Sequence, residues 1–276
     1  MTQSIFAALA ELEAAGETAA LCTIVREHGS VPRHAGSKML VYPDGRFVGT
    51  VGGGEMESRV IRAAQAALRD GTTQMLRYQL ANPAAGDPGV CGGEVEIFVE
   101  PIKPLPTVLI IGGGHVGRAL AHLARWLDFR VSLSDDRPEY CNAEWAPEAN
   151  AFWPVPVSEL AERYPFNAET YIVMPTRGVP LDVDALPRLL DKPHAYLGVI
   201  GSRRRWATAL KRLEAAGVPA ERLANVHAPM GLELKAETPE EIAVSVMAEI
   251  IMLRRGGTGQ PMQWKQAEDE VEAGPV

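Results

Sequence analysis

The 276-residue sequence is poor in cysteine and has no surplus of positive charge. Its three cysteines, Cys22, Cys91 and Cys141, are scattered without CxxC spacing, which argues against a disulfide framework or a structural zinc site, and no metal site is predicted. We expect Cys22 and Cys141 to be small buried residues. The formal net charge of −8 argues against a general nucleic-acid-binding protein, because such proteins need a basic face.

Long apolar runs are missing as well. No segment approaches the roughly 20 consecutive apolar residues of a membrane span. The amphipathic segment 1–17 contains acidic residues and lacks the basic start and small-residue cleavage site of a secretory signal. These absences predict a soluble, cytoplasmic protein without a membrane partner.

The length of the chain predicts two domains, since a domain takes roughly 100–200 residues. The change to regular strand–helix alternation after residue 106 indicates the same division. Residues 101–106, PIKPLP, mark the linker, because proline interrupts helices and central strands alike. We expect an α+β domain over 1–103, a Rossmann-like doubly wound domain over 104–255, and a flexible tail over 256–276.

The first domain shows short strand patterns separated by turn residues. Pro43-Asp44-Gly45 between two apolar runs indicates a hairpin, and the sheet is expected to be largely antiparallel or mixed. The predicted helices are 2–15 and about 56–70, and the predicted strands are 19–26, 37–42, 47–51, 73–79 and 94–100.

The second domain alternates apolar strands with helices, which is typical of a parallel sheet covered on both faces. Its last helix begins at Thr238-Pro239-Glu240-Glu241, a sequence that offers an N-cap, a proline at the first position and a capping-box glutamate. The predicted strands are 108–111, 130–134, 171–175 and 195–200, and the predicted helices are 115–127, near 157–163, near 182–190, 202–216 and 239–254.

Residues 112–117, GGGHVG, fit the GxGxxG pattern of a dinucleotide loop, between an apolar strand and a helix. Gly112 permits the tight turn, Gly114 lets backbone N–H groups approach a pyrophosphate, and Gly117 allows close helix packing. Asp135, about 20 residues downstream, is the expected ribose ligand and makes NADP the poorer candidate. The alternative is a Rossmann fold that binds nothing.

A second candidate for phosphate binding is Ser202-Arg203-Arg204-Arg205, which follows another strand and opens a helix. Ser202 is the expected cap, and Arg203 is a planar donor for phosphate. The alternative is a solvated arginine-rich helix face.

A hydride-transfer enzyme needs a proton donor or acceptor beside the nicotinamide, and no histidine–aspartate pair stands at useful spacing. An NAD-dependent oxidoreductase and a regulatory nucleotide-binding module are therefore kept as alternative functions.

An earlier glycine triplet lies in VGGGEMES, residues 51–58, but lacks the third glycine of GxGxxG. Glu55 and Glu57 suit the positive end of a helix themselves and compete with phosphate there. We interpret Gly53 and Gly54 as a tight turn that brings backbone toward the same ligand, facing Cys91 and the Rossmann edge.

Several long motifs, spread from about residue 5 to 254, resemble the XdhC/CoxI family. They are GSVPRHAGSKMLV (29–41), DGRFVGTVGGGEMES (44–58), GVCGGEVEIFVEP (89–101), VLIIGGGHVGRAL (108–120), SDDRPEY (134–140), YLGVIGSRRR (196–205) and PMGLELKAETPEEIAVSVMAEI (229–250).

The resemblance implies an accessory protein of molybdenum hydroxylases such as xanthine dehydrogenase. Such proteins bind the molybdenum cofactor as molybdopterin or a pterin dinucleotide, support its sulfuration with a cysteine desulfurase, and pass it to the apo-hydroxylase. The resemblance thus implies a homodimeric cofactor chaperone rather than a turnover enzyme, with the cofactor as cargo.

Carried onto this chain, the resemblance gives a set of expected site residues. Cys91, between glycines whose N–H groups can lower a thiol pKa, is expected to handle sulfur or molybdenum, although a buried turn cysteine is the alternative. The expected cofactor-binding residues are Gly112, Gly114, His115, Gly117, Asp135, Ser202, Arg203, Arg33, Gly53 and Gly54.

The sequence departs from the family pattern twice. Gly54 stands where CoxI-like members have cysteine, so Cys91 would act alone. Arg177 and Val179 stand where members often have two histidines, and Arg177 adds a phosphate-type donor at the same sheet edge.

Overall fold

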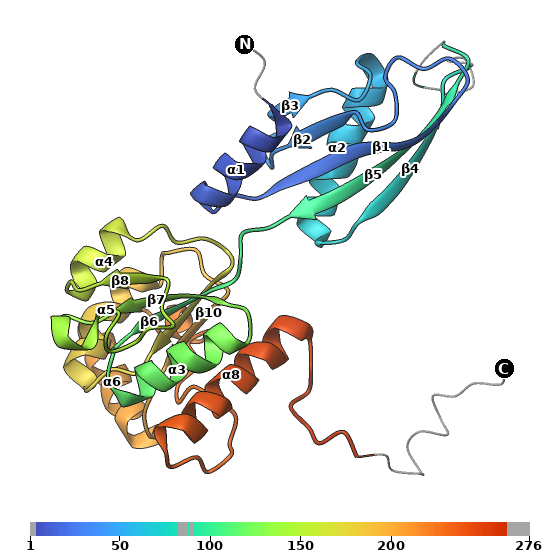
Figure 1. The fold of residues 1–276 in the computed structure, drawn as a ribbon. Helices are drawn as coiled ribbons and strands as arrows, with labels where there is room; N and C mark the ends of the chain where they lie inside the picture. Colours follow the sequence, from blue (N-terminus) through green and yellow to red (C-terminus); the bar gives the residue numbers. More distant parts are fainter. Residues whose placement is uncertain (1–3, 82–87, 89–90, 264–276) are drawn as a thin grey trace. The chain divides into compact units, whose positions relative to one another are not determined.

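The computed structural model describes residues 4–81, 88 and 91–263, and the chain forms two compact units (Figure 1). One unit comprises Met1–Pro106 with Tyr164–Glu169, and the other comprises Thr107–Arg163 with Thr170–Val276. No helix of the described residues is long and apolar enough to cross a membrane.

The first unit is a five-stranded sheet with one helix on each face. Every strand pairing that the structure describes in it is antiparallel, in the order β3-β2-β1-β5-β4, which confirms the α+β prediction. Its elements are α1 (Ile5–Ala15), β1 (Ala19–His28), β2 (Lys38–Val41), β3 (Phe47–Gly49), α2 (Gly54–Asp70), β4 (Gln74–Gln79) and β5 (Glu94–Ile102).

Alternation along the strands divides the core of this unit into two layers. Cys22, Ile24 and Ile97 are buried in the layer that also contains the apolar side of α2, whereas Leu12 of α1 packs with Leu40 in the other layer. Successive strand residues point to opposite faces, so this pattern fixes the register. The prediction that Cys22 is a buried apolar residue is confirmed.

The second unit contains a five-stranded parallel sheet in the order β10-β9-β6-β7-β8, with helices on both sides. The Rossmann-like prediction is therefore confirmed. Its elements are β6 (Thr107–Ile111), α3 (His115–Trp126), β7 (Arg130–Ser134), η2 (Pro138–Tyr140), β8 (Ala151–Trp153), α4 (Val157–Arg163), β9 (Thr170–Met174), α5 (Val179–Leu189), β10 (Tyr196–Val199), α6 (Arg203–Ala215), α7 (Ala220–Leu223) and α8 (Pro239–Arg255).

The strand order of this sheet reverses at β6. From β6 the chain proceeds outward through β7 and β8, then returns to the other side of β6 for β9 and β10. In open parallel sheets such a switch point leaves a crevice beyond the carboxyl ends of the strands, and ligands bind there.

Helices α3 and α8 lie side by side on one face of this sheet (Figure 1). Leu120 and Ala124 of α3 share a buried cluster with Val246 and Ile250 of α8. The expected capping box begins α8, since Thr238 accepts from the backbone N–H of Glu241, whose side chain accepts from the N–H of Thr238. The sequence thus predicted the start of this helix correctly.

Candidate functional site

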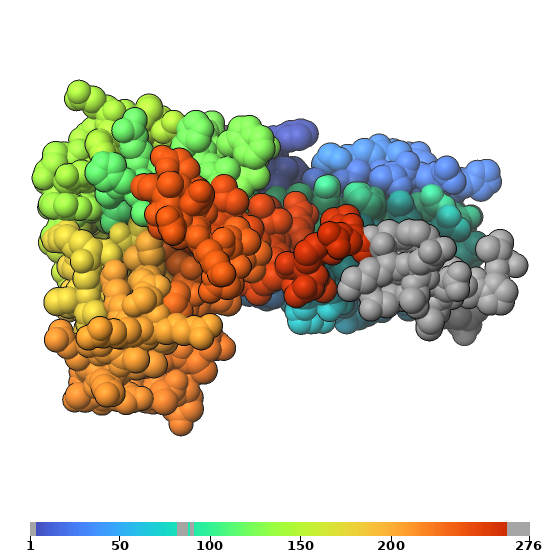
Figure 2. Space-filling model, turned by 90° about the horizontal axis from the view of Figure 1, so that it is seen from below, coloured from blue at the N-terminus to red at the C-terminus, as the bar shows by residue number. Residues whose placement is uncertain are grey.

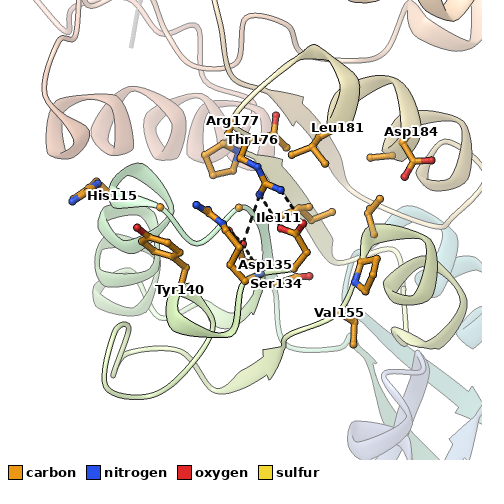
Figure 3. A pocket seen from close by; sticks show the side chains of 18 residues that line it. Ile111, His115, Ser134, Asp135, Tyr140, Val155, Thr176, Arg177, Leu181 and Asp184 are labelled. Carbon is orange, nitrogen blue, oxygen red and sulfur yellow. Dashed lines mark hydrogen bonds and ion pairs between the residues drawn. The ribbon is translucent and has the colours of Figure 1, made fainter.

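A cavity of about 290 Å³ opens at the switch point of the parallel sheet. Its walls come from the ends of β6, β7 and β9, the segment before α4, and the first half of α5 (Figure 3). That volume lies at the lower end of the range of small-molecule pockets. The cavity occupies the place where this fold is expected to hold a ligand.

The loop after β6 requires glycine at several positions for steric reasons. Gly112 has a φ of 124°, and a Cβ there would lie 2.8 Å from the carbonyl oxygen of Pro175. A Cβ on Gly113 would lie 2.0 Å from the carbonyl oxygen of Tyr140, and one on Gly117 would lie 2.0 Å from that of Gly112. These positions exclude larger residues, so the loop can pass close to its neighbours.

Gly114 is the N-cap of α3, and no side chain caps the helix. The N–H groups of the first turn and the positive end of the helix dipole are therefore available to an anion. Gly112, Gly114 and His115 line the cavity, as the sequence indicated, and the ligand contacts expected of them remain predictions.

Asp135 is almost completely buried beneath the cavity and fastens the glycine loop. One carboxylate oxygen accepts a hydrogen bond from the N–H of Gly113 at 2.8 Å. The backbone N–H of Arg137 donates at 3.0 Å, and its guanidinium donates to both oxygens at 2.9 Å. The carboxylate thus already has four donors, and the predicted ribose contact remains a prediction.

The neighbouring Asp136 is paired with a residue of another loop. The two terminal nitrogens of Arg177 donate to its two oxygens, each at 2.8 Å. This guanidinium holds the pKa of Asp136 at about 2. Arg177, noted in the sequence as a donor at this edge, therefore lines the cavity with its charge compensated.

Aromatic side chains surround one end of the glycine loop. The indole nitrogen of Trp145 donates to the carbonyl oxygen of Gly113 at 2.5 Å. Tyr140 and His115 meet the Trp145 ring edge-on, with centroids 5.2 and 5.6 Å away. Sequence reasoning missed Trp145, because it lies in an irregular stretch 32 residues from its partner in the chain.

The arginine run at the start of α6 divides into two roles. Ser202 caps the helix as predicted, since its hydroxyl accepts from the N–H of Arg205 at 3.2 Å. The Arg205 guanidinium turns inward to the buried carboxylate of Asp182, at 2.8–3.1 Å, and to Thr176. Arg203 is exposed, and its role toward phosphate, like that of Ser202, remains a prediction.

The first unit presents its own glycine turn before α2. Gly53 and Gly54 have φ angles of 83° and 64°, so both adopt the left-handed backbone that favours glycine. Glu55 pairs with Arg59 at 3.1 Å, and Glu57 accepts from the hydroxyl of Thr50. Acidic side chains therefore occupy the first turn of this helix, as expected.

Cys91 is the exposed cysteine of the chain, whereas Cys22 and Cys141 are buried. Burial raises the pKa of the Cys22 thiol to about 12 and also raises that of Cys141. The alternative of a buried turn cysteine at Cys91 is therefore wrong. Arg33 is also exposed, between β1 and β2.

Other titratable residues of the second unit form a structural cluster. Glu249 accepts from the hydroxyl of Tyr196 at 2.6 Å and from the N–H of Gly231 at 2.7 Å, and it lies 3.0 Å from Nδ1 of His227. These contacts give His227 a structural role in the fold. Within the described part of the chain, no group of three His, Cys, Asp or Glu is placed to hold a metal ion.

Fold and site together define a two-unit protein whose second unit is a Rossmann-type domain with a cavity at its switch point. Residues 108–250 match the family described as the XdhC Rossmann domain, and residues 12–79 match the XdhC and CoxI family. The chain belongs to the XdhC/CoxI family.

Curated relatives extend this similarity. Uncharacterized protein YqeB of Escherichia coli (strain K12) is 34% identical over 93% of this chain and 47% of its own length. A probable xanthine dehydrogenase subunit of Bacillus subtilis (strain 168) is 32% identical over 58% of this chain and 46% of its own length. The chain thus spans about half the length of these two relatives.

Two further matches cover most of both chains. The molybdenum cofactor insertion chaperone PaoD of Escherichia coli (strain K12) is 23% identical over 87% of this chain and 84% of its own. A crystal structure described as a xanthine dehydrogenase from Bacillus halodurans matches with a TM-score of 0.50 and 20% identity, over 96% and 98% of the chains. The latter supports the fold alone.

Proposed function

We propose that this protein binds the molybdenum cofactor and delivers it to an apo-hydroxylase of the xanthine dehydrogenase type. The observation that carries the proposal is the cavity at the switch point, which is lined by Arg177 and by the start of α3, a helix without a side-chain cap. The similarity to PaoD, a molybdenum cofactor insertion chaperone, supports this cargo.

The cargo carries groups that suit this cavity. Every form of the cofactor carries a phosphate or a pyrophosphate, for which a helix N-terminus is a ready site. A volume of about 290 Å³ suits one part of a pterin dinucleotide, with the remainder outside the cavity. Tyr140 lines the wall and offers an aromatic surface to a flat heterocycle.

We also propose that Cys91 takes part in sulfuration of the cargo together with a cysteine desulfurase. The support is its exposure beside Gly92 and Gly93, since a thiol must be accessible to exchange sulfur. A Cβ on Gly93 would lie 2.3 Å from the carbonyl oxygen of Ser30, so the backbone packs closely two residues after the thiol.

The thiols are expected to differ in reactivity. At pH 8 a maleimide should label one thiol in the folded protein and none in Cys91→Ser, because Cys22 and Cys141 are buried and their pKa values are raised. In denaturant, mass spectrometry should find three labelled thiols in the wild type and two in the variant.

Cys91→Ser should also abolish activation of the apo-hydroxylase, whereas Cys141→Ser should retain it. Full activation by Cys91→Ser would contradict the sulfur role.

We further propose that the protein is a homodimer that pairs through α8. A single stripe of this helix carries Glu240, Val244, Ala248, Ile251 and Arg255, and both Val244 and Ile251 are exposed. Figure 2 shows α8, in orange to red, at the molecular surface. Antiparallel pairing of two copies about Ala248 places Val244 against Ile251 and acidic ends against basic ends, as a two-fold interface requires.

Light scattering tests this pairing. The wild type is expected at twice the mass of the chain, and Ala248→Glu at the mass of one chain, because two like charges would meet on the symmetry axis. Leu253→Glu is the matched control, since Leu253 is exposed on the same helix but off the stripe. A monomeric wild type, or equal dissociation by both variants, would refute the interface.

An NAD-dependent oxidoreductase remains the second candidate, favoured by the glycine loop between β6 and α3. A regulatory nucleotide-binding module would use the same loop. Equilibrium binding of pterin ligands, NAD and CTP separates these functions.

A further inference from the structure

The ion pair between Asp136 and Arg177 crosses the mouth of the ligand crevice. Asp136 lies just beyond the end of β7, and Arg177 lies three residues beyond the end of β9. Strands β7 and β9 flank β6 on opposite sides. A contact between residues that follow these two strands must therefore pass over the carboxyl end of β6, where the glycine loop begins.

Figure 3 shows the same arrangement at the level of side chains. The interactions of Arg177 lie in the middle of the view, with His115 and Tyr140 on one side and Val155, Leu181 and Asp184 on the other. All of these residues line the cavity. A ligand that extends along the crevice across the glycine loop meets this ion pair.

Two aspartate–arginine pairs stand next to each other here, and they differ in burial. Asp135 is 2% exposed and is bound to the loop backbone as well as to Arg137, so this pair is a fixed part of the fold. The side chains of Asp136 and Arg177 are 39% and 47% exposed. An exposed pair of this kind changes an equilibrium by about fivefold or less, so a ligand can displace it.

The backbone at Arg177 is held in place even though the side chain of this residue is exposed. The preceding residue, Thr176, donates to buried Asp182, and its carbonyl oxygen accepts from Arg205 at 3.1 Å. Exchange of partners therefore requires rotation of a side chain and no rearrangement of the loop. The guanidinium fork fits the oxygens of a phosphate as well as those of a carboxylate.

We propose that the Asp136–Arg177 ion pair is a latch, closed in the free protein, and that a phosphate of the ligand replaces Asp136 on Arg177 when the ligand binds. This inference rests on the proposed function, since it assumes a phosphate-bearing ligand in the cavity. Arg177 is then a residue that selects phosphorylated ligands, and Asp136 is its internal competitor. Arg177 also lowers the pKa of Asp136, so the competing carboxylate is charged throughout the neutral range.

The two members of the latch are expected to have opposite effects on binding. The probe is the fluorescent oxidised pterin phosphate released from a molybdenum hydroxylase, titrated into the full-length protein. Asp136→Asn should tighten binding by up to about fivefold, because the competitor is removed. Arg177→Gln should weaken it at least tenfold, through loss of a charge-assisted pair. The double variant should bind as Arg177→Gln does.

The same pterin after removal of its phosphate by a phosphatase is the matched control, and neither variant should lose affinity for it. If Asp136→Asn weakens binding of the phosphate form as Arg177→Gln does, the pair is a structural clamp and the latch is refuted. Equal effects on both pterins refute the phosphate contact. If the folded wild type and Asp136→Asn bind neither pterin, the proposed function fails, and the latch fails with it.

Discussion

Replacing Asp182 by alanine is expected to lower the free energy of unfolding of the second unit by about 3–5 kcal/mol. Asp182 has no exposed surface and accepts three hydrogen bonds from the Arg205 guanidinium and one from the hydroxyl of Thr176. Without the carboxylate, a guanidinium that is 22% exposed keeps its charge but loses its partner. Removing one member of a buried pair is costly because the other charge remains.

Urea unfolding followed by tryptophan fluorescence measures this loss. All five tryptophans follow residue 107 in the sequence, so their signal reports on the second unit and the tail. Asp184→Ala is the control, because Asp184 lies on the same helix, is 52% exposed and pairs with Arg188 at 3.5 Å. It should change stability by about 1 kcal/mol or less. Equal destabilisation by both variants would contradict a buried clamp.

Replacing Gly117 by alanine is expected to weaken binding of the pterin phosphate at least a hundredfold, or about 2.7 kcal/mol. The new Cβ would lie 2.0 Å from the carbonyl oxygen and 3.0 Å from the carbonyl carbon of Gly112. These are backbone atoms of the loop itself, so the start of α3 must move away from β6. Its N–H groups would then no longer converge on the cavity.

Gly114→Ala separates binding from folding in the same loop. No atom lies within 4 Å of a Cβ at Gly114, whose φ of −59° suits any residue, so the stability of this variant should match the wild type. Gly114 lines the cavity, and the added methyl group should still weaken binding. Wild-type affinity in Gly117→Ala would show that the ligand binds elsewhere.

Local patterns carried most of the fold prediction. Strands such as β6 and β9 are nearly continuous apolar runs, and Gly117 is required by the backbone of the loop itself at Gly112. Gly112 and Gly113 instead face Pro175 and Tyr140, which lie far away in the sequence. Three short elements, η2, β8 and α7, were not predicted. β8 has three residues and follows an irregular stretch, which leaves no period to detect.

The helix α5 begins at Val179 rather than near residue 182. Pro180 lies within its first turn, where proline is tolerated because the N–H it lacks has no helical partner there. The sequence pattern alone places this proline ahead of the helix.

The residues that shape the site were less accessible to sequence reasoning. Asp182 and Arg205 are 23 positions apart, and Asp136 and Arg177 are 41 apart. The first pair joins helices α5 and α6, and the second joins the loops after β7 and β9, so each depends on the strand order of the sheet. In sequence, Arg203, Arg204 and Arg205 are equivalent, and burial against Asp182 alone distinguishes the last. The expected role of Cys91 came from the family resemblance and remains a prediction, and the structure adds that the thiol is exposed.

The central claim is that the switch-point cavity binds a phosphate-bearing pterin, and a fluorescence titration of the full-length protein tests it most directly. Saturable binding of one pterin phosphate per chain is predicted for the wild type, with loss in Gly117→Ala and no displacement by NAD. Absence of saturable binding to the folded wild type, or binding of NAD in place of the pterin, would contradict the claim.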